Sequence, residues 1–266
     1  MAPLKENQIG VVRLGRRPYL EMSASQADLV EARRAGRLGD LLLVLEHPAT
    51  YTKGRRTEPA DLLRSPGHYA ERGIEVCDTP RGGKVTYHGP GQLVIYPVID
   101  LRGIGEQPEE VDRIDVAGFV SALERAMTAA LTRWEVEAAR IEGLTGLWVS
   151  RKDPIPDDAT AVSMAPGVAR GEVRKIGSIG LRISRGISSH GLSLNVSCDL
   201  SPFDDITSCG IEQCQVTSIA LETGNAPSVD EVGQAVCDEL AALLGRDPVP
   251  VSPAEIGLGT PVSATA

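Results

Sequence analysis

Several features that would mark a particular class of protein are scarce in this chain of 266 residues. Its formal net charge is −9, so it lacks the basic excess that a broad nucleic-acid-binding surface requires. It has no run of about 18 consecutive apolar residues, the length that a membrane-spanning helix needs. Aromatic residues make up only 3% of the chain, so any core must consist mainly of Leu, Val, Ile and Ala. We therefore expect neither nucleic acid nor membrane among its partners.

Cysteine is also scarce, with five residues at uneven spacing: Cys77, Cys198, Cys209, Cys214 and Cys237. An odd number in a chain of this size does not fit a secreted disulfide framework. The N-terminal residues show no apolar segment followed by a small-residue cleavage site, the pattern of a signal peptide. These features predict a cytoplasmic protein with reduced thiols.

Apolar periodicity predicts three main helices. A capping box of Ser23 and Gln26 predicts a helix that begins at Ser23 and ends at Gly36 or Gly39. Apolar residues at three-and-four spacing predict a long helix over 109–134. A second capping box, Ser228 with Glu231, predicts a helix that ends at Gly245.

Short aliphatic segments punctuated by glycine predict strands at 41–48, 92–101, 144–150, 174–184 and 190–200. Residues 152–171, rich in Pro, Asp, Ala and Gly, predict a surface loop. The last twenty residues, from Asp247, show no usable period and are expected to be frayed. Strands and helices in this mixed order favour a single α/β or α+β domain over residues 1–245, with a flexible tail at 246–266.

The densest group of glycines lies in "RGGKVTYHGPGQLVIYP", residues 81–97. Such glycines let the backbone approach a ligand closely, and Arg81, Lys84 and His88 add cations and an acid–base group. The plainer interpretation is a pair of tight turns, which glycine pairs form more often than binding sites. Neither a phosphate-binding loop nor a dinucleotide fingerprint is present.

Lys175 and His190 lie in two glycine-containing segments farther along the chain. A lysine beside an apolar strand is usually a surface residue, but near another group it can shift that group's pKa. His190, next to Gly191, is more often a hydrogen-bonded structural residue than a base.

Cys209, in "DDITSCGIEQC", allows four interpretations: a nucleophile, half of a bridge with Cys214, a metal ligand, or filler. The spacing to Cys214 matches no common zinc motif, so no metal is expected. The predicted reducing compartment disfavours a bridge. The loop around Cys209 could expose a thiol, whereas Cys77, Cys198 and Cys237 lie in apolar patterns and are expected in the core.

Taken together, the segments resemble the bacterial lipoyl(octanoyl) transferases. The match rests on "LLLVLEHPATYTKGRR", "RGGKVTYHGPGQLVIYPVIDL", "GLTGLWV", "KIGSIGLRISRGISSHGLSLNVSCDL" and "FDDITSCGIEQCQVTSI", which occur in the family's order and extend from about residue 8 to 245. The resemblance implies an α/β domain related to lipoate and biotin protein ligases, with a curved mixed sheet around an acyl-binding tunnel.

The resemblance also implies a role for each matching residue. Cys209 is similar to the nucleophile that carries the acyl thioester, and Lys175 is similar to its partner. The substrate-binding residues it implies are Arg81, Gly82, Gly83, Lys84, Val85, Thr86, Tyr87 and His88, with Ser178, Ile179, Gly180, Gly191, Leu192 and Ser193 as further walls. His190 and Asn195 match as positioning residues. The chain departs from the family at Ser208, where many members have Pro, and at Gly177, where many have Ala.

The activity implied is octanoyl or lipoyl transfer from octanoyl-acyl carrier protein, without a cofactor. The implied acceptors are lysines on the lipoyl domains of 2-oxoacid dehydrogenases and on the glycine cleavage H protein. Two alternatives stay open, an ATP-dependent lipoate-protein ligase and a non-catalytic acyl-binding relative. Basic residues at Lys53, Arg55 and Arg56, and at Arg33, Arg34 and Arg37, could dock an acidic carrier protein or form a solvated face.

Overall fold

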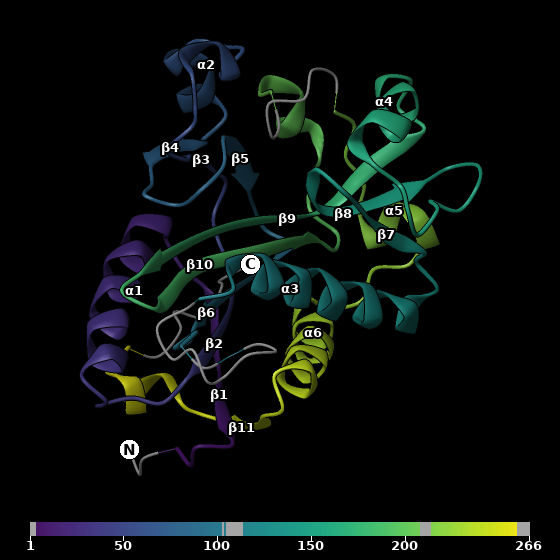
Figure 1. Cartoon of the computed structure of the whole chain (residues 1–266). Helices are drawn as coiled ribbons and strands as arrows, with labels where there is room; N and C mark the ends of the chain where they lie inside the picture. Colours follow the sequence, from purple (N-terminus) through teal and green to yellow (C-terminus); the bar gives the residue numbers. More distant parts are fainter. Residues whose placement is uncertain (1–3, 103, 105–113, 208–213, 260–266) are drawn as a thin grey trace.

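An eight-stranded sheet forms the centre of the structure, a computed structural model that describes residues 4–102, 104, 114–207 and 214–259 (Figure 1). In order across the sheet, its strands are β11 (Asp247–Pro250), β1 (Gln8–Arg16), β2 (Leu41–Glu46), β6 (Gln92–Val98), β10 (Ile187–Asn195), β9 (Val173–Ser184), β8 (Leu144–Ser150) and β7 (Ala138–Ile141). β11, β1 and β2 run parallel, and the other neighbours pair antiparallel. The predicted α/β class with a mixed sheet is confirmed.

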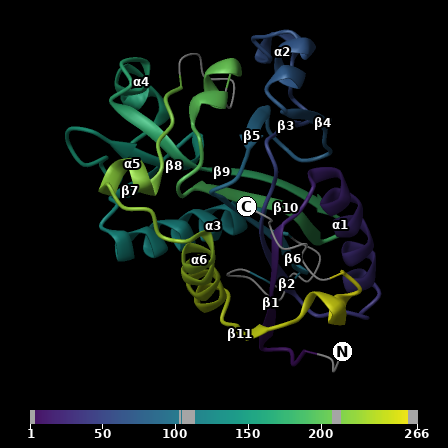
Figure 2. The ribbon, with the colours of Figure 1, turned by 180° about the vertical axis from the view of Figure 1, so that it is seen from behind.

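Helices cover both faces of the sheet. Figures 1 and 2 show α1 (Tyr19–Arg34) on one side of β1, β2 and β6, and α3 (Val116–Leu131) with α6 (Val229–Leu243) on the other. Side chains of β2 alternate between two cores: Leu42 and Val44 pack with α3 and α6, whereas Leu41 and Leu43 pack with α1. A strand buried on both faces reads as a continuous apolar run, which explains "LLLVLE".

A smaller sheet stands beside β9 and β10 (Figure 1). It has the order β4 (Glu75–Asp78), β3 (Thr50–Lys53) and β5 (Val85–His88), with the short helix α2 (Pro66–Glu71) packed on it. Its core is aromatic, formed by Tyr51, Tyr69, Tyr87 and Phe203. The few aromatic residues of the chain are thus concentrated where small elements must pack without long aliphatic strands.

The predicted start of the first helix is wrong. α1 begins at Tyr19 after Pro18, and Ser23 lies inside the helix rather than capping it. The ring of Tyr19 is buried, so tertiary packing holds the first turn that the capping pattern did not predict. α3 begins at Val116, with Asp115 as its cap, and residues 109–113 of the predicted helix lie outside the described residues. The capping box of Ser228 and Glu231 on α6 is confirmed.

Two segments expected to be irregular contain regular structure. Residues 152–171 include α4 (Ala161–Ala169), which begins with a capping box of Thr160 and Ser163. Pro166 lies within this helix, and proline normally argues against a helix in the sequence. Residues 247–250 are not frayed but form β11, which pairs with β1. β11 is held by hydrogen bonds to β1, which is far away in the sequence, so no local sequence pattern predicts this strand. The remaining elements are α5 (Ile219–Thr223) and 3-10 turns at Pro59–Asp61, Thr132–Trp134, Ser201–Asp205 and Pro253–Ile256.

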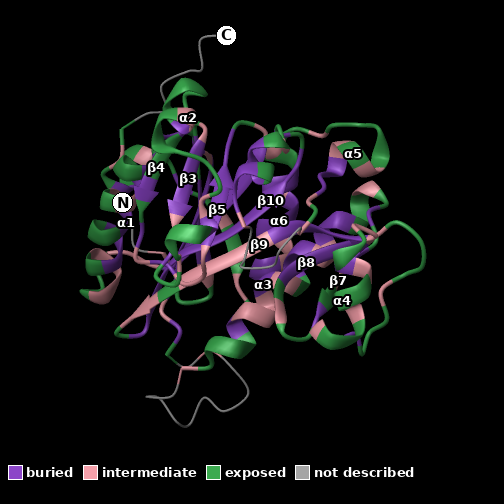
Figure 3. Cartoon of the chain, turned by 90° about the horizontal axis from the view of Figure 1, so that it is seen from above, coloured by how far each residue is buried: buried purple, intermediate pink, exposed green. Residues whose placement is uncertain are grey.

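Burial is uneven along β9. Its first five residues are buried, whereas most residues from Ser178 onward are partly exposed, and Figure 3 shows this strand in the intermediate colour. A central strand of a sheet is normally covered, so this exposure marks an opening above it. Within the described ranges, no helix is long and apolar enough to cross a membrane.

A buried carboxylate ties the chain that follows β10 to the smaller sheet. The side chain of Asp205 is 6% exposed. It accepts hydrogen bonds from Arg64 (3.0 Å), His68 (3.0 Å) and Arg72 (2.7 Å). Burial by itself would raise the pKa of this carboxyl, but the three donors outweigh burial and lower the pKa below its usual value. The ionised carboxylate is therefore part of the folded state.

Replacing Asp205 with Asn should lower the free energy of unfolding by about 2 kcal/mol, a value at the low end for charged hydrogen bonds because the donors are partly exposed. Since the folded-state pKa lies below the unfolded one, the difference between the two proteins should be complete above about pH 4 and vanish as the pH falls through the folded-state pKa. Urea unfolding at a series of pH values from 7 downward measures both. The exposed neighbour Asp204→Asn is the control, and an equal loss there would contradict the assignment.

Candidate active site

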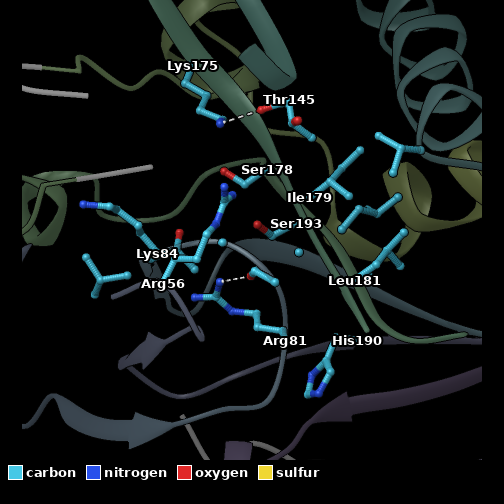
Figure 4. A pocket seen from close by; sticks show the side chains of 18 of the residues that line it. Arg56, Arg81, Lys84, Thr145, Lys175, Ser178, Ile179, Leu181, His190 and Ser193 are labelled. Carbon is cyan, nitrogen blue, oxygen red and sulfur yellow. Dashed lines mark hydrogen bonds between the residues drawn. The ribbon is translucent and has the colours of Figure 1, made fainter. Parts of the chain in front are cut away.

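A pocket of about 430 Å³ lies over β9 and β10, on the side of the smaller sheet (Figure 4). Its walls come from the β9–β10 hairpin, the loop before β5, the turn at 143–145 and the start of α3. Four basic side chains line it, those of Arg56, Arg81, Lys84 and Lys175. Among the described residues, no carboxylate lines the pocket. Lys84 is paired with Asp61 (3.1 Å), so Arg56, Arg81 and Lys175 contribute most of the positive charge in this pocket of an acidic chain.

The loop of residues 81–84 forms one wall and is clamped from two sides. Gly82 donates its N–H to the carbonyl of Leu181 on β9 (2.9 Å). Arg55 and Arg56 donate theirs to the carbonyls of Arg81 and Gly83 (3.1 Å each). These bonds join the loop to the larger sheet on one side and to the chain after β3 on the other. The glycine-rich segment is therefore a fixed wall rather than a simple turn.

The guanidinium of Arg81 is buried inside this wall. It donates to the carbonyl of Thr52 (2.6 Å), to the hydroxyl of Thr52 (2.8 Å) and to the carbonyl of Gly82 (2.8 Å). Gly180 makes room for it, because a Cβ there would lie 3.0 Å from Cδ of Arg81. Arg81 thus holds its own loop and keeps a positive charge at the pocket wall.

The floor of the pocket is the paired middle of β9 and β10. The register places Ser178 opposite Ser193, Ile179 opposite Leu192 and Gly180 opposite Gly191. All six of these predicted residues line the pocket. Position 191 requires glycine, because a Cβ there would lie 2.2 Å from the carbonyl oxygen of Ile95.

Lys175 lies at one end of the pocket and is 4% exposed. Its Nζ donates to the carbonyl of Thr145 (2.8 Å) and lies 5.0 Å from the ring centroid of Trp148. Gly146 has φ +108, and a Cβ there would come within 2.9 Å of Cε of Lys175. Glu124 on α3 accepts the Gly146 N–H (2.8 Å), which fixes this turn. A buried ammonium held by a carbonyl and an aromatic face is positioned for a nearby reactive group.

Cys209, the predicted nucleophile, lies outside the described residues, as does Ser208. The chain on either side of them is anchored. Thr207 donates its N–H to the carbonyl of Asp61 (2.9 Å). Beyond the gap, Lys175 donates its N–H to the carbonyl of Gln215, and Thr217 donates to the carbonyl of Lys175 (2.9 Å each). The backbone that follows the Cys209 segment therefore pairs with β9 at Lys175.

Two histidines line the pocket, and both are neutral. Burial lowers the pKa of His88 well below its ordinary value, and the hydrogen bond from its Nδ1 to Oε1 of Gln92 (2.7 Å) leaves Nε2 as an acceptor. Burial and the nearby charge of Arg81 lower the pKa of His190 to about 4. Neither ring adds to the positive charge of the pocket near neutral pH.

Two predicted residues do not line the pocket. The ring of Tyr87 packs in the core of the smaller sheet, because alternation along β5 directs Thr86 and His88 to the pocket and Tyr87 to the opposite face. Its assignment to the substrate site is therefore not supported by its position. Asn195 lies beyond the pocket, where its Nδ2 donates to the carbonyl of Thr217 (2.9 Å) and its Oδ1 accepts from Nε2 of Gln92 (2.9 Å). This position ties β10 to the chain after the Cys209 segment.

The sequence did not predict several residues that line the pocket: Tyr19, Arg56, Tyr96, Val116, Val120, Gly143, Leu144, Thr145, Trp148 and Leu181. Most come from elements that looked purely structural. Alternation along β9 could have identified Leu181, two residues after Ile179, but nothing local marks Tyr19 or Tyr96. No group of three or more potential metal ligands occurs within the residues that the structure describes.

Comparisons with known proteins identify the family of the chain. The family described as the lipoyl protein ligase A/B catalytic domain matches residues 18–241. The chain is 41% identical over 247 residues to an octanoyltransferase of Mycobacterium sp. strain KMS, covering 91% of this chain and 90% of that protein. An octanoyltransferase of Acidobacterium capsulatum is 41% identical over 221 residues, covering 83% of each.

Solved structures show the same fold. A bi-partite lipoate protein ligase from Thermoplasma acidophilum superposes with a TM-score of 0.65 at 15% identity, covering 92% of this chain and 87% of that one. Lipoate-protein ligase A bound with ATP gives a TM-score of 0.64 at 16% identity, covering 92% and 89%. Since the family match and the 41% identical relatives both span most of the sequence, the chain belongs to the lipoyl protein ligase A/B catalytic domain family.

Proposed function

We propose that the chain transfers an octanoyl group from octanoyl-acyl carrier protein to a lysine of lipoyl domains, through a thioester on Cys209. Octanoyl transfer in lipoylation, by an acyltransferase, follows from the family and from the octanoyltransferase relatives. Three parts of the proposal go beyond those findings: the thioester route, the carrier protein as donor, and the acceptors. The proposed acceptors are the 2-oxoacid dehydrogenases and the glycine cleavage H protein. The three parts are argued from the site.

The observation that carries the thioester route is the position of Lys175. Its ammonium is buried at the end of the pocket, and its backbone pairs with Gln215 and Thr217, where the chain returns after the Cys209 segment. A thiol beside an ammonium has a lowered pKa and a larger thiolate fraction at neutral pH. This supports Cys209 as the nucleophile and Lys175 as the group that activates it.

The chemistry balances without an energy source. The thiolate of Cys209 attacks the carbonyl carbon of the donor thioester, the new C–S bond forms, and the donor's C–S bond breaks to release its thiol, which takes up the proton lost from Cys209. The acceptor lysine then attacks the enzyme thioester. A C–N bond forms, the C–S bond to Cys209 breaks, and the amine proton passes by way of Lys175 to the Cys209 thiolate.

The pocket suits an apolar chain along one side. Figure 4 shows Ile179 and Leu181 on the side opposite Arg56 and Lys84, and Val120 and Leu144 add further apolar surface. Burial of each methylene contributes about 0.8 kcal/mol, so an octanoyl tail would gain several kcal/mol there. The cationic side is left for the polar part of the donor.

An ATP-dependent ligase is the main alternative, because the fold is shared with lipoate-protein ligase A. Such an enzyme would activate free octanoate as an adenylate and would not need Cys209. A non-catalytic acyl-binding protein is the second alternative. The pairing of Lys175 with Gln215 and Thr217, shortly after Cys209 in the sequence, argues against it.

Incubation with octanoyl-acyl carrier protein, without ATP, should add one octanoyl mass to the peptide that contains Cys209. Addition of a lipoyl domain should then remove it, because the amide is the more stable product. Peptide mass spectrometry measures both steps. Cys209→Ser should reduce transfer at least 100-fold, whereas Cys214→Ser serves as the control. Transfer that requires ATP and free octanoate, or a label on another residue, would establish the ligase instead.

Lys175→Ala should raise the pH at which iodoacetamide alkylates Cys209 by about one unit or more, since a neighbouring cation lowers the pKa of a thiol by about that amount. Peptide mapping across pH measures this. Burial raises the pKa of Cys77, Cys198 and Cys237 to about 12, so their thiols stay unreactive in this range. Lys152→Ala, at an exposed lysine, is the control. An unchanged profile for Lys175→Ala rules out its activating role.

The basic patch of Arg55 and Arg56 supports a docking role better than the one on α1. Arg33 and Arg34 are already paired with Asp40 (2.7 Å) and Glu31 (2.6 Å). Arg55 and Arg56 are exposed, and Arg56 lines the pocket. Figure 4 shows the guanidinium of Arg56 directed toward Ser178.

The double variant Arg55→Glu, Arg56→Glu should therefore weaken binding of an acidic carrier protein about 10-fold at low salt, and less at 0.5 M salt because charges are screened there. Fluorescence titration with acyl carrier protein measures the dissociation constant. Arg37→Glu, an exposed arginine at the end of α1, should have no effect. Equal affinities for all three proteins would show that the patch is only a solvated face.

A further inference from the structure

The position of the Lys175 ammonium depends on the first residues of β8. Its Nζ donates to the carbonyl of Thr145 (2.8 Å), a bond that Figure 4 shows at the end of the pocket. The ring of Trp148, on the same strand, has its centroid 5.0 Å from this nitrogen. Trp148 is fixed by its pairing with Lys175 in the sheet. The Thr145 carbonyl is therefore the contact whose own support has to be explained.

Thr145 and Gly146 lie in a part of β8 that the sheet does not hold. The register of β8 with β9 extends from Leu147 to Ser150, and within the described strands neither Thr145 nor Gly146 has a partner on β9 or β7. Gly146 has φ +108, and a Cβ there would collide with the carbonyl oxygen of Gly177. The backbone here approaches β9 closely without joining its ladder, so a buried N–H in this stretch needs a partner from elsewhere.

Glu124 on α3 supplies that partner. Its Oε1 accepts the N–H of Gly146 (2.8 Å), directly after the carbonyl that binds the ammonium. Val116, Val120 and Glu124 follow one another at four-residue spacing, so they share one face of α3, and the two valines line the pocket. The face of α3 that forms a pocket wall therefore also carries the acceptor that holds the Lys175 contact.

The carboxyl of Glu124 lies in surroundings that disfavour its charge. Burial raises its pKa, and the Gly146 N–H and the charges of Arg140 on β7 and Lys175 on β9 offset only part of that effect. Arg140 donates to the hydroxyl of Ser121 (2.7 Å), one turn earlier on α3. A carboxyl with a perturbed pKa beside a pocket is a candidate for a functional role, and its hydrogen bond to Gly146 indicates which role.

We propose that Glu124 is a positioning residue for Lys175. By binding the Gly146 N–H it fixes the neighbouring Thr145 carbonyl, and this carbonyl holds the ammonium at the end of the pocket. The inference rests on the proposed function only for the role of Lys175 itself. A glutamine could make the same hydrogen bond, because it also carries an Oε1 acceptor. Without an acceptor, the buried Gly146 N–H would be unpaired, which favours movement of the chain toward water.

Competitive acetylation of lysines by acetic anhydride, read by peptide mass spectrometry, measures how Lys175 is held without any acyl transfer. In the wild type, Lys175 should react about 10-fold or more slowly than the exposed Lys152, because a buried amine reacts only after local opening. Glu124→Ala should raise the ratio of Lys175 to Lys152 labelling about 10-fold, since a hydrogen bond to a charged group is lost. Glu124→Leu, which keeps the bulk of the side chain, should do the same. Glu124→Gln should keep the ratio near the wild-type value.

A double variant tests whether Glu124 acts through Lys175. Glu124→Ala should slow acylation of Cys209 by octanoyl-acyl carrier protein about 10-fold, but it should slow the Lys175→Ala variant little further, because the two residues act as one unit. Glu124→Gln should restore most of the rate. Glu142→Ala, at an exposed glutamate between β7 and β8, is the matched control and should leave both the labelling ratio and the rate unchanged.

An unchanged labelling ratio in Glu124→Ala and Glu124→Leu would overturn the positioning role. So would additive losses in the double variant, or a Glu124→Gln variant as impaired as Glu124→Ala. The expected labelling ratios in a wild type whose Cys209 is not acylated would have a different meaning. They would refute the thioester route and leave the positioning of Lys175 by Glu124 established.

Discussion

The antiparallel pairing of β9 with β10 determines where nearly every group of the pocket lies. It sets Ser178 against Ser193 and Gly180 against Gly191, and it gives the 81–84 loop a strand to bind, through the carbonyl of Leu181. A slip of one residue would turn these side chains to the opposite face. On its other edge β10 pairs with β6, and that pairing requires glycine at position 191 because a Cβ there would meet the carbonyl oxygen of Ile95.

The side chains of the pocket carry positive charge, although the chain as a whole is negatively charged. Arg56, Arg81, Lys84 and Lys175 line a cavity in an acidic protein, while the buried histidines beside them stay neutral. Positive charge therefore lies at the Lys175 end and also at the wall, where Arg81 comes close enough to His190 to lower the pKa of that ring.

The sequence predicted β8, β9 and β10 because aliphatic runs are local signals, and the resemblance to the family implied most of the residues that line the pocket. It failed where neighbours far along the chain decide the outcome. Tyr87 belongs to the aromatic core of the smaller sheet rather than to the pocket, although Thr86 and His88 on either side of it line the pocket. β11 exists because β1 supplies its hydrogen bonds, and α1 begins at Tyr19 because that ring is buried, not because a capping box starts there.

The amino-acid sequence by itself determined the family, through the resemblance of its ordered motifs, and the α/β class, through the periodicity of its segments, since both are properties of the chain alone. Only the tertiary structure decided which side chains share a cavity, how Lys175 is held, and that His190 is buried without a partner in a left-handed backbone. The reason is physical: burial, pKa and hydrogen-bond satisfaction depend on groups brought together from distant parts of the chain.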